Sequence, residues 1–154
     1  MAIAVNTKAP LFTLKRRKDG GFEEISLADN LGKKTVLLFV PAAFSSICQD
    51  ELCSISAGLD QYAELGAEVW GISVDNPFAL EAWENIANIG FPLLSDWNRE
   101  VIHAYDVATD DFIGYKDVAK RSAFVIDEEG TVIYSWSSDD ARVLPPFDEL
   151  KAVL

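Results

Sequence analysis

The sequence predicts an α/β domain with a central mixed β-sheet and helices on both of its faces. From residue 35 onward, short apolar runs alternate with helical patterns, which is typical of parallel strands joined by helical crossovers. Late in the chain, apolar runs at residues 122–126 and 131–136 flank Asp-Glu-Glu-Gly, which predicts an antiparallel hairpin. With 154 residues the chain has the length of one ordinary domain, so residues 1–154 are expected to form a single domain.

The predicted elements follow one another in a regular order. Residues 12–15 and 22–25 flank KRRKDGG, whose Gly-Gly predicts a small N-terminal β-hairpin extension. The elements after it are a strand at 35–40, a helix at 47–65, a strand at 68–74, a helix that starts at 76–77, a short strand at 91–94, a short helix at 98–105, the hairpin, and a last helix at 147–154. This order suits a thioredoxin-like fold.

The helix that starts at residues 76–77 has the clearest start signal. Asn76 is a favoured capping residue, and Pro77 suits the first helical position. We expect four apolar residues to form its inner face, namely Phe78, Ala82, Trp83 and Ile86.

The net charge is −12, and it is unevenly distributed. Residues 1–34 hold seven Lys or Arg and four Asp or Glu, whereas residues 35–154 hold six and twenty-one. Such a field repels nucleic acid and anionic membranes, so neither is an expected partner. Residues 1–10 lack the pattern of a secretory signal, and no apolar run approaches the roughly 20 residues that span a bilayer. We therefore expect a cytoplasmic protein.

The only two cysteines, Cys48 and Cys53, follow the strand predicted at residues 35–40. Ser46 and Gln49 match the capping-box pattern, which would place Cys48 in the first turn of a helix. Free N–H groups and the helix dipole stabilise an anion there, and the thiolate is the nucleophilic form of cysteine. Cys48 also begins an apolar seam that continues through Leu52, Ile55, Leu59 and Tyr62, so a buried structural cysteine is the alternative interpretation.

Pro41, Ser45 and Cys48 form the pattern Pro-x-x-x-Ser-x-x-Cys, which closely resembles the active-site signature of peroxiredoxins in the alkyl hydroperoxide reductase/thiol-specific antioxidant family. Glu51 stands where that family usually carries glutamate. Three further stretches resemble the family: GISVDN at 71–76, FPLLSDWNREV at 91–101, and KRSAFVIDEEGTVIY at 120–134, which contains Arg121. The resemblance covers nearly the whole chain and implies a thiol-dependent peroxidase without a metal or other cofactor.

The resemblance assigns a role to each of these residues. Cys48 attacks the peroxide, Ser45 donates its hydroxyl, Arg121 holds the thiolate and the developing charge, Pro41 shields the sulfur, and Glu51 orients Arg121. The residues themselves support the need for a cation, because Asp50 and Glu51 place negative charge near Cys48. Each role has a structural alternative: Ser45 as a cap, Pro41 as a strand terminator, and Arg121 in a surface ion pair.

Cys53 follows Cys48 by five residues, which places their Cα atoms roughly 8–9 Å apart in an intact helix. A disulfide requires less than about 7 Å, so the first turn would have to unwind before the two could pair. The spacing resembles the bacterioferritin-comigratory (PrxQ) branch of peroxiredoxins, where such a cysteine resolves the sulfenic acid and thioredoxin reduces the disulfide. Other stretches resemble the alkyl hydroperoxide reductase E branch, in which the second cysteine is not required.

Three functions therefore stay open. The first is a peroxidase that reduces hydrogen peroxide and alkyl hydroperoxides, with Cys53 as resolving cysteine and thioredoxin or another thiol as reductant. The second is a one-cysteine peroxidase recycled by an external thiol, and the third is a non-catalytic peroxide sensor or interaction module. The resemblance implies a monomer or a homodimer. A zinc site is not expected from one histidine and two cysteines.

Overall fold

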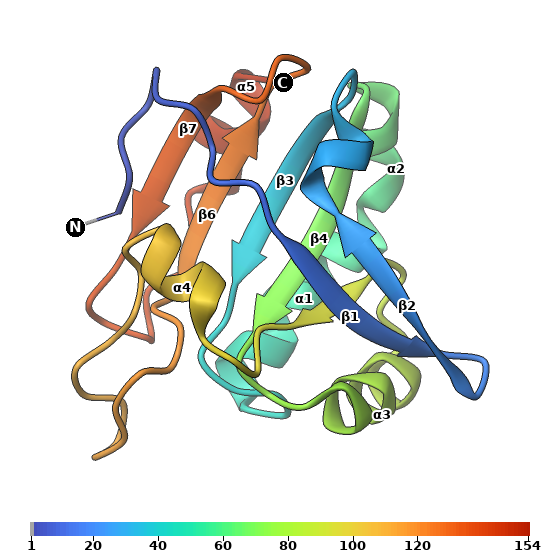
Figure 1. The fold of residues 1–154 in the computed structure, drawn as a ribbon, viewed down its shortest axis with the longest axis vertical. Helices are drawn as coiled ribbons and strands as arrows, with labels where there is room; N and C mark the ends of the chain where they lie inside the picture. Colours follow the sequence, from blue (N-terminus) through green and yellow to red (C-terminus); the bar gives the residue numbers. More distant parts are fainter. Residues whose placement is uncertain (1) are drawn as a thin grey trace.

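The computed structural model describes residues 2–154, which contain one seven-stranded mixed sheet in the order β2-β1-β5-β4-β3-β6-β7 (Figure 1). The strands are β1 Thr13–Lys18, β2 Gly21–Ser26, β3 Lys34–Phe39, β4 Ala67–Ser73, β5 Leu93–Ser95, β6 Ser122–Ile126 and β7 Val132–Ser137. The helices are the 3-10 helix η1 Leu27–Asn30, α1 Ser46–Ala57, α2 Leu59–Glu64, α3 Pro77–Ala87, α4 Glu100–Ala104 and α5 Phe147–Ala152. Strands β3, β4 and β5 are parallel, and the two hairpins add antiparallel pairs. The predicted fold class is confirmed.

Helices cover both faces of the sheet, as Figure 1 shows. Successive side chains of β3 point to opposite faces, because the side-chain period of a strand is two. Val36 and Leu38 belong to a core that includes residues of α1, α3 and α5, whereas Leu37 and Phe39 belong to a second core with residues of α4. Strand β3 is therefore buried on both sides. The loop at residues 40–45 connects its carboxyl end to the start of α1.

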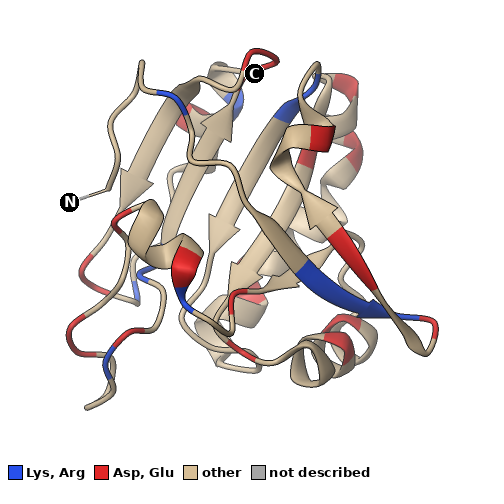
Figure 2. Ribbon diagram, viewed as in Figure 1, with Lys and Arg blue, Asp and Glu red and all other residues tan. Residues whose placement is uncertain are grey.

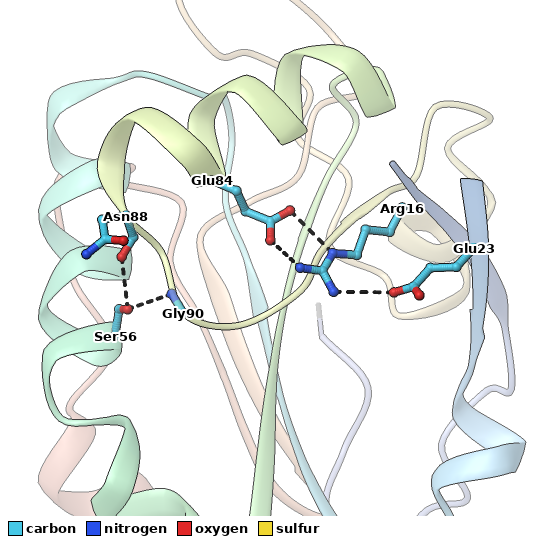
Figure 3. Close-up of polar contacts among 6 residues, drawn as sticks. All are labelled: Arg16, Glu23, Ser56, Glu84, Asn88 and Gly90. Carbon is cyan, nitrogen blue, oxygen red and sulfur yellow. Dashed lines mark hydrogen bonds and ion pairs between the residues drawn. The ribbon is translucent and has the colours of Figure 1, made fainter. Parts of the chain in front are cut away.

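Ion pairs attach the N-terminal hairpin to α3. Figure 2 shows the basic residues gathered on β1. Arg16 of β1 donates to both carboxylate oxygens of Glu84 at 2.5 and 3.4 Å, and it also pairs with Glu23 (Figure 3). Arg17 lies 3.2 Å from Glu81 and contacts the ring of Phe22. The contact between Arg16 and Glu84 is bidentate, and both side chains are largely buried. It therefore helps to set the orientation of α3.

The expected inner face of α3 was wrong in three of its four positions. Phe78, Ala82 and Ile86 are exposed. The buried residues of the helix are Leu80, Trp83 and Glu84. A glutamate can be buried here because Arg16 neutralises it. The expected start of the helix is confirmed, since the Asn76 side chain accepts the backbone N–H of Ala79 at 2.9 Å.

The helix predicted over residues 47–65 is two helices that meet at Gly58, because glycine is a poor helix former. The apolar seam nevertheless continues across the break, with four of its five residues buried and Leu59 packed against the core. The end of α1 is fastened to the turn after α3: the Ser56 hydroxyl donates to the Asn88 carbonyl and accepts the N–H of Gly90 at 2.7 Å (Figure 3).

The other elements differ from the prediction only in their bounds. The predicted strand at 91–94 is β5, which starts two residues later, and the predicted helix at 98–105 is the shorter α4. Within residues 2–154, no helix combines the length and the apolar composition needed to cross a membrane.

Candidate active site

The loop between β3 and α1 carries Pro41 and Ser45 to the edge of the sheet. It is held by Asp75, which follows β4 and accepts the N–H of Ala43 at 2.8 Å. The hydroxyl of Ser73 donates to the same carboxylate, so Asp75 is itself fixed in place. Asp75 belongs to the GISVDN stretch, but the sequence alone did not assign it a function. The structure shows that it positions the loop from which α1 starts.

The start of α1 differs from the predicted capping box. Ser45, not Ser46, is the capping residue, and no side-chain hydrogen bond closes this end of the helix. The Ser45 hydroxyl instead donates to the Ala42 carbonyl at 3.0 Å, and the Gln49 side chain accepts the indole N–H of Trp83. The predicted capping box between Ser46 and Gln49 is therefore not formed, and Gln49 is held by Trp83 of α3 instead. The first N–H groups of α1 therefore stay available to an anion.

Arg121 brings the candidate residues together from distant parts of the chain. It directly precedes β6 and is almost fully buried, with 1% of its surface exposed. Its guanidinium donates to Cys48 Sγ at 3.1 Å, to Glu51 Oε2 at 2.5 Å and to the Ala141 carbonyl at 2.8 Å. Three directed contacts fix the position of its charge, and one of them ends on the sulfur. The alternative of a surface ion pair does not fit this arrangement.

Glu51 is fully buried behind the arginine. Burial raises the pKa of Glu51 from 4.5 to about 7, and the charge of Arg121 opposes this rise without cancelling it. Its second oxygen, Oε1, has no hydrogen-bond partner among the described residues. The charge of the Glu51 carboxyl therefore changes with pH near neutrality, and the strength of its ion pair with Arg121 changes with it.

A groove of about 600 Å³ leads to this cluster. It is lined by Ser45, Ser46 and Arg121 and by the loops at residues 111–113 and 139–142. Cys48 does not line the groove and has no exposed surface, but its sulfur contacts the lining residue Arg121. The groove therefore reaches the immediate neighbour of the sulfur. Pro41 is buried at the neighbouring edge of the site.

Cys53 lies one and a half turns further along α1. Both cysteines are free thiols, and the helix between them is continuous. The thiol of Cys53 is half-buried and faces the Ala87 carbonyl of α3 at 3.6 Å. In the intact helix, the sulfur of Cys48 therefore contacts Arg121, whereas the sulfur of Cys53 contacts the Ala87 carbonyl. Among residues 2–154, no three His, Cys, Asp or Glu side chains are grouped in a way that could hold a metal ion.

Comparison with known proteins decides the family. The model of the AhpC/TSA family matches residues 5–135, which is most of the chain. This chain belongs to the AhpC/TSA family. The motif around Cys48 and the segment with Arg121 both lie within the residues that the family model matches.

Individual relatives agree with the assignment. A chloroplastic 2-cysteine peroxiredoxin of Chattonella marina var. antiqua is 37% identical over 143 residues, which cover 88% of this chain and 71% of the relative. A mitochondrial thioredoxin-dependent peroxide reductase of Drosophila melanogaster is 31% identical over 156 residues, which cover 97% of this chain and 64% of the relative. The reduced 2-Cys peroxiredoxin of Plasmodium vivax superimposes with a TM-score of 0.86 at 28% identity, and the match covers 97% of this chain and 79% of that one.

These matches confirm the predicted family, its thioredoxin-like fold and its class of enzyme, a peroxiredoxin. They do not confirm the expected branch. The three relatives are named as 2-cysteine or thioredoxin-dependent enzymes, and they do not single out the bacterioferritin-comigratory or the alkyl hydroperoxide reductase E branch.

Proposed function

We propose that this AhpC/TSA-family chain reduces hydroperoxides with Cys48 as the attacking thiolate. The observation that carries the proposal is the contact of 3.1 Å between Arg121 and Cys48 Sγ, made at the uncapped start of α1. A fixed cation and a helix N-terminus both stabilise negative charge placed beside them. Arg121 and the first residues of α1 line a groove of about 600 Å³, and the buried sulfur contacts Arg121 directly.

The first reaction step follows from this arrangement. The thiolate takes the terminal oxygen of the peroxide, the O–O bond breaks, and the leaving oxygen takes up a proton and departs as water or an alcohol. Negative charge grows on that leaving oxygen, and Arg121 and the backbone N–H groups at the start of α1 are in place to stabilise it. Ser45 would turn its hydroxyl from Ala42 to the peroxide. Cys48 is left as a sulfenic acid.

Cys53 is the proposed resolving cysteine. Its thiol would attack the sulfenic sulfur, so that a disulfide forms and water leaves. The intact helix forbids this, because it holds the two Cα atoms roughly 8–9 Å apart. The start of α1 must unwind, which also pulls Glu51 away from Arg121. In this internal pairing the chain would resemble the bacterioferritin-comigratory branch.

A one-cysteine mechanism is the second candidate. It is favoured by the contact of Cys53 with the Ala87 carbonyl, which directs this thiol toward α3 rather than toward Cys48. In this mechanism an external thiol attacks the sulfenic acid directly, and α1 stays folded. For the disulfide route, a thioredoxin-type dithiol is the proposed reductant, which the name of the Drosophila relative supports.

One experiment tests both mechanisms. One equivalent of hydrogen peroxide is added to the reduced protein, and intact mass and free thiols are measured for the wild type and Cys53→Ser. We expect the wild type to lose two hydrogens and both thiols, and the variant to accumulate a sulfenic acid that can be trapped. A sulfenic acid in both proteins would support the one-cysteine mechanism. The absence of any reaction at Cys48 would refute the peroxidase proposal.

A further inference from the structure

The loop between β3 and α1 contains one residue in an unfavourable backbone conformation. Phe44 has a φ angle of 64°, in the left-handed region, where the Cβ of an ordinary residue crowds the backbone. Of the eight non-glycine residues with a positive φ in the described chain, five are Asn or Asp, which tolerate this region, whereas Phe44 is bulky. Ser45, the next residue, is extended again with a φ of −68° and caps α1. The conformation of Phe44 therefore sets the direction in which the chain enters the helix.

The side chain of Phe44 does not by itself offset this strain. It is 46% exposed and belongs to neither apolar core, and its one ring contact is with Trp83, at 6.1 Å between the ring centroids. A strained residue persists only where the surrounding structure holds it, and such residues concentrate at functional sites. The loop must therefore have another contact that holds Phe44 in its left-handed conformation.

Asp75 makes that contact at the neighbouring residue. The N–H of Ala43, which directly precedes Phe44, donates to the Asp75 carboxylate at 2.8 Å. On the other side of Phe44, the Ser45 hydroxyl donates back to the Ala42 carbonyl. A hydrogen bond to a carboxylate and the strain of one left-handed residue are of similar size, so this single bond is able to offset the strain.

The sheet holds Asp75 itself in place. The hydroxyl of Ser73 on β4 donates to the Asp75 carboxylate and accepts the N–H of Asp75 at 2.9 Å. The hydroxyl of Ser95 on β5 donates to the Asp75 carbonyl at 2.6 Å. Both serines are buried, and β4 lies between β3 and β5 in the middle of the sheet. The carboxylate is therefore attached to a rigid part of the fold and resists movement of the loop.

We propose that Asp75 is a positioning residue for peroxide reduction: through Ala43 it holds Phe44 in the strained conformation that places Ser45 and the start of α1 for the peroxide. The inference rests on the proposed peroxidase function and adds a residue to it. The strain at Phe44 is released when the start of α1 unwinds. The bond to Asp75 therefore favours the form that reacts with peroxide, and the strain favours the form in which Cys48 is uncovered.

The kinetic test compares two reactions of Cys48 in Asp75→Ala and Asp75→Asn, all in a Cys53→Ser background that leaves one thiol. Oxidation by hydrogen peroxide needs the placed donors, whereas alkylation by iodoacetamide needs only an uncovered sulfur. We expect Asp75→Ala to slow oxidation by about 10- to 150-fold and to speed alkylation. Asparagine keeps an oxygen that accepts the N–H of Ala43, so Asp75→Asn should stay close to the parent protein in both reactions.

Three outcomes would overturn the inference. The first is an unchanged rate of oxidation in Asp75→Ala. The second is a loss of both reactions, which indicates general damage rather than release of the loop. The third is an Asp75→Asn variant as slow as Asp75→Ala, since the acceptor oxygen would then not be the active feature.

A second test asks whether Asp75 acts against the strain at Phe44. Phe44→Asn and Phe44→Ala both remove the ring, but only asparagine adopts a positive φ readily. Asp75→Ala should therefore slow oxidation much less when it is added to Phe44→Asn than when it is added to Phe44→Ala. Equal losses in the two backgrounds would overturn the link between Asp75 and the strain.

The matched control is Asp127→Ala. Asp127 is also an aspartate that accepts backbone N–H groups in a loop, from Glu129 at 2.9 Å and from Thr131 at 2.8 Å. It lies between β6 and β7 and does not line the groove. The control should leave the rates of oxidation and alkylation unchanged. Equal changes in Asp127→Ala and Asp75→Ala would count against a specific role of Asp75.

Hydrogen exchange separates the role of Asp75 from the chemistry. The amide of Ala43 is followed by NMR in the reduced wild type and in Asp75→Ala. We expect slow exchange in the wild type and fast exchange in the variant, because the variant lacks the acceptor. This difference in a protein whose Cys48 does not react with peroxide would uphold the contact and overturn the proposed function. A reactive wild type in which the Ala43 amide exchanges as fast as in Asp75→Ala would do the reverse.

Discussion

Replacing Arg121 with lysine keeps the positive charge but removes the planar guanidinium, whose three nitrogens donate in different directions. The guanidinium makes three contacts in three directions, to Cys48 Sγ, to Glu51 and to the Ala141 carbonyl. Lysine offers one nitrogen, which cannot occupy all three positions. We expect the ammonium to stay with the buried carboxylate of Glu51, because an unpaired buried charge is the costliest of the possible losses. The contact with the sulfur is then lost.

The size of the effect follows from that single contact. A hydrogen bond to a charged group contributes about 1.5–3 kcal/mol. If Arg121→Lys loses this amount in the transition state, the reaction with hydrogen peroxide slows by about 10- to 150-fold, since about 1.4 kcal/mol corresponds to a factor of ten. The free energy of unfolding should fall less, by about 1 kcal/mol for the lost bond to the Ala141 carbonyl.

The assay is stopped-flow tryptophan fluorescence, which can follow Cys48 because the indole of Trp83 contacts Gln49 of α1. Arg142→Lys is the matched control, as Arg142 also lines the groove but pairs with Asp140 in solvent. Its rate should stay within about twofold of the wild type. A rate for Arg121→Lys that is equally close to the wild type would refute the reasoning, because charge without the planar guanidinium would then be sufficient.

Three further predictions follow from other contacts. Burial raises the pKa of Glu51 from 4.5 to about 7, so its contribution to the free energy of unfolding is greatest below the lower value and is lost as pH rises through the higher one. Urea unfolding should detect this decline in the wild type and not in Glu51→Gln; the same decline in both proteins would contradict it. Ser56→Ala removes the fastening of α1 to the turn after α3, which should cost about 1–2 kcal/mol and speed disulfide formation after oxidation, and an unchanged rate would count against the fastening. Exposed Ser54 in the same helix provides the control Ser54→Ala. Glu84→Leu leaves Arg16 with Glu23 as its remaining carboxylate partner and should cost about 1–3 kcal/mol in urea unfolding, most of which the added change Arg16→Met should recover; an equal loss in the double variant would disprove the pairing.

The fold was largely predictable because its signals are local. A central strand buried on both faces is a continuous apolar run, and Asn76 with Pro77 marks a helix start whatever lies beyond it. The inner face of α3 was not predictable in the same way. Glu84 can be buried because β1 brings Arg16 against the helix from a point 68 residues earlier in the chain. No periodicity within α3 carries that information.

The candidate site divides in the same manner. The Ser46 and Gln49 pattern predicted a helix start around Cys48, and the resemblance to peroxiredoxins pointed to Arg121. The capping box of Ser46 and Gln49 was wrong because the helix is capped one residue earlier, at Ser45, and the Gln49 side chain accepts the indole N–H of Trp83. The role of Asp75 in holding the loop was invisible in the sequence, since it depends on a neighbour from another element.

Taken alone, the sequence specified the order of the elements and the family, and it predicted Cys48 as the reactive thiol. These depend on residue types at short spacing, which act through backbone preference, apolar periodicity and helix capping. Tertiary structure decided which charges meet. Arg121 reaches Cys48 from 73 residues away, and the burial that raises the pKa of Glu51 exists only when α1 packs against the sheet. Electrostatic strength depends on distance and on exclusion from water, and both are properties of the folded chain.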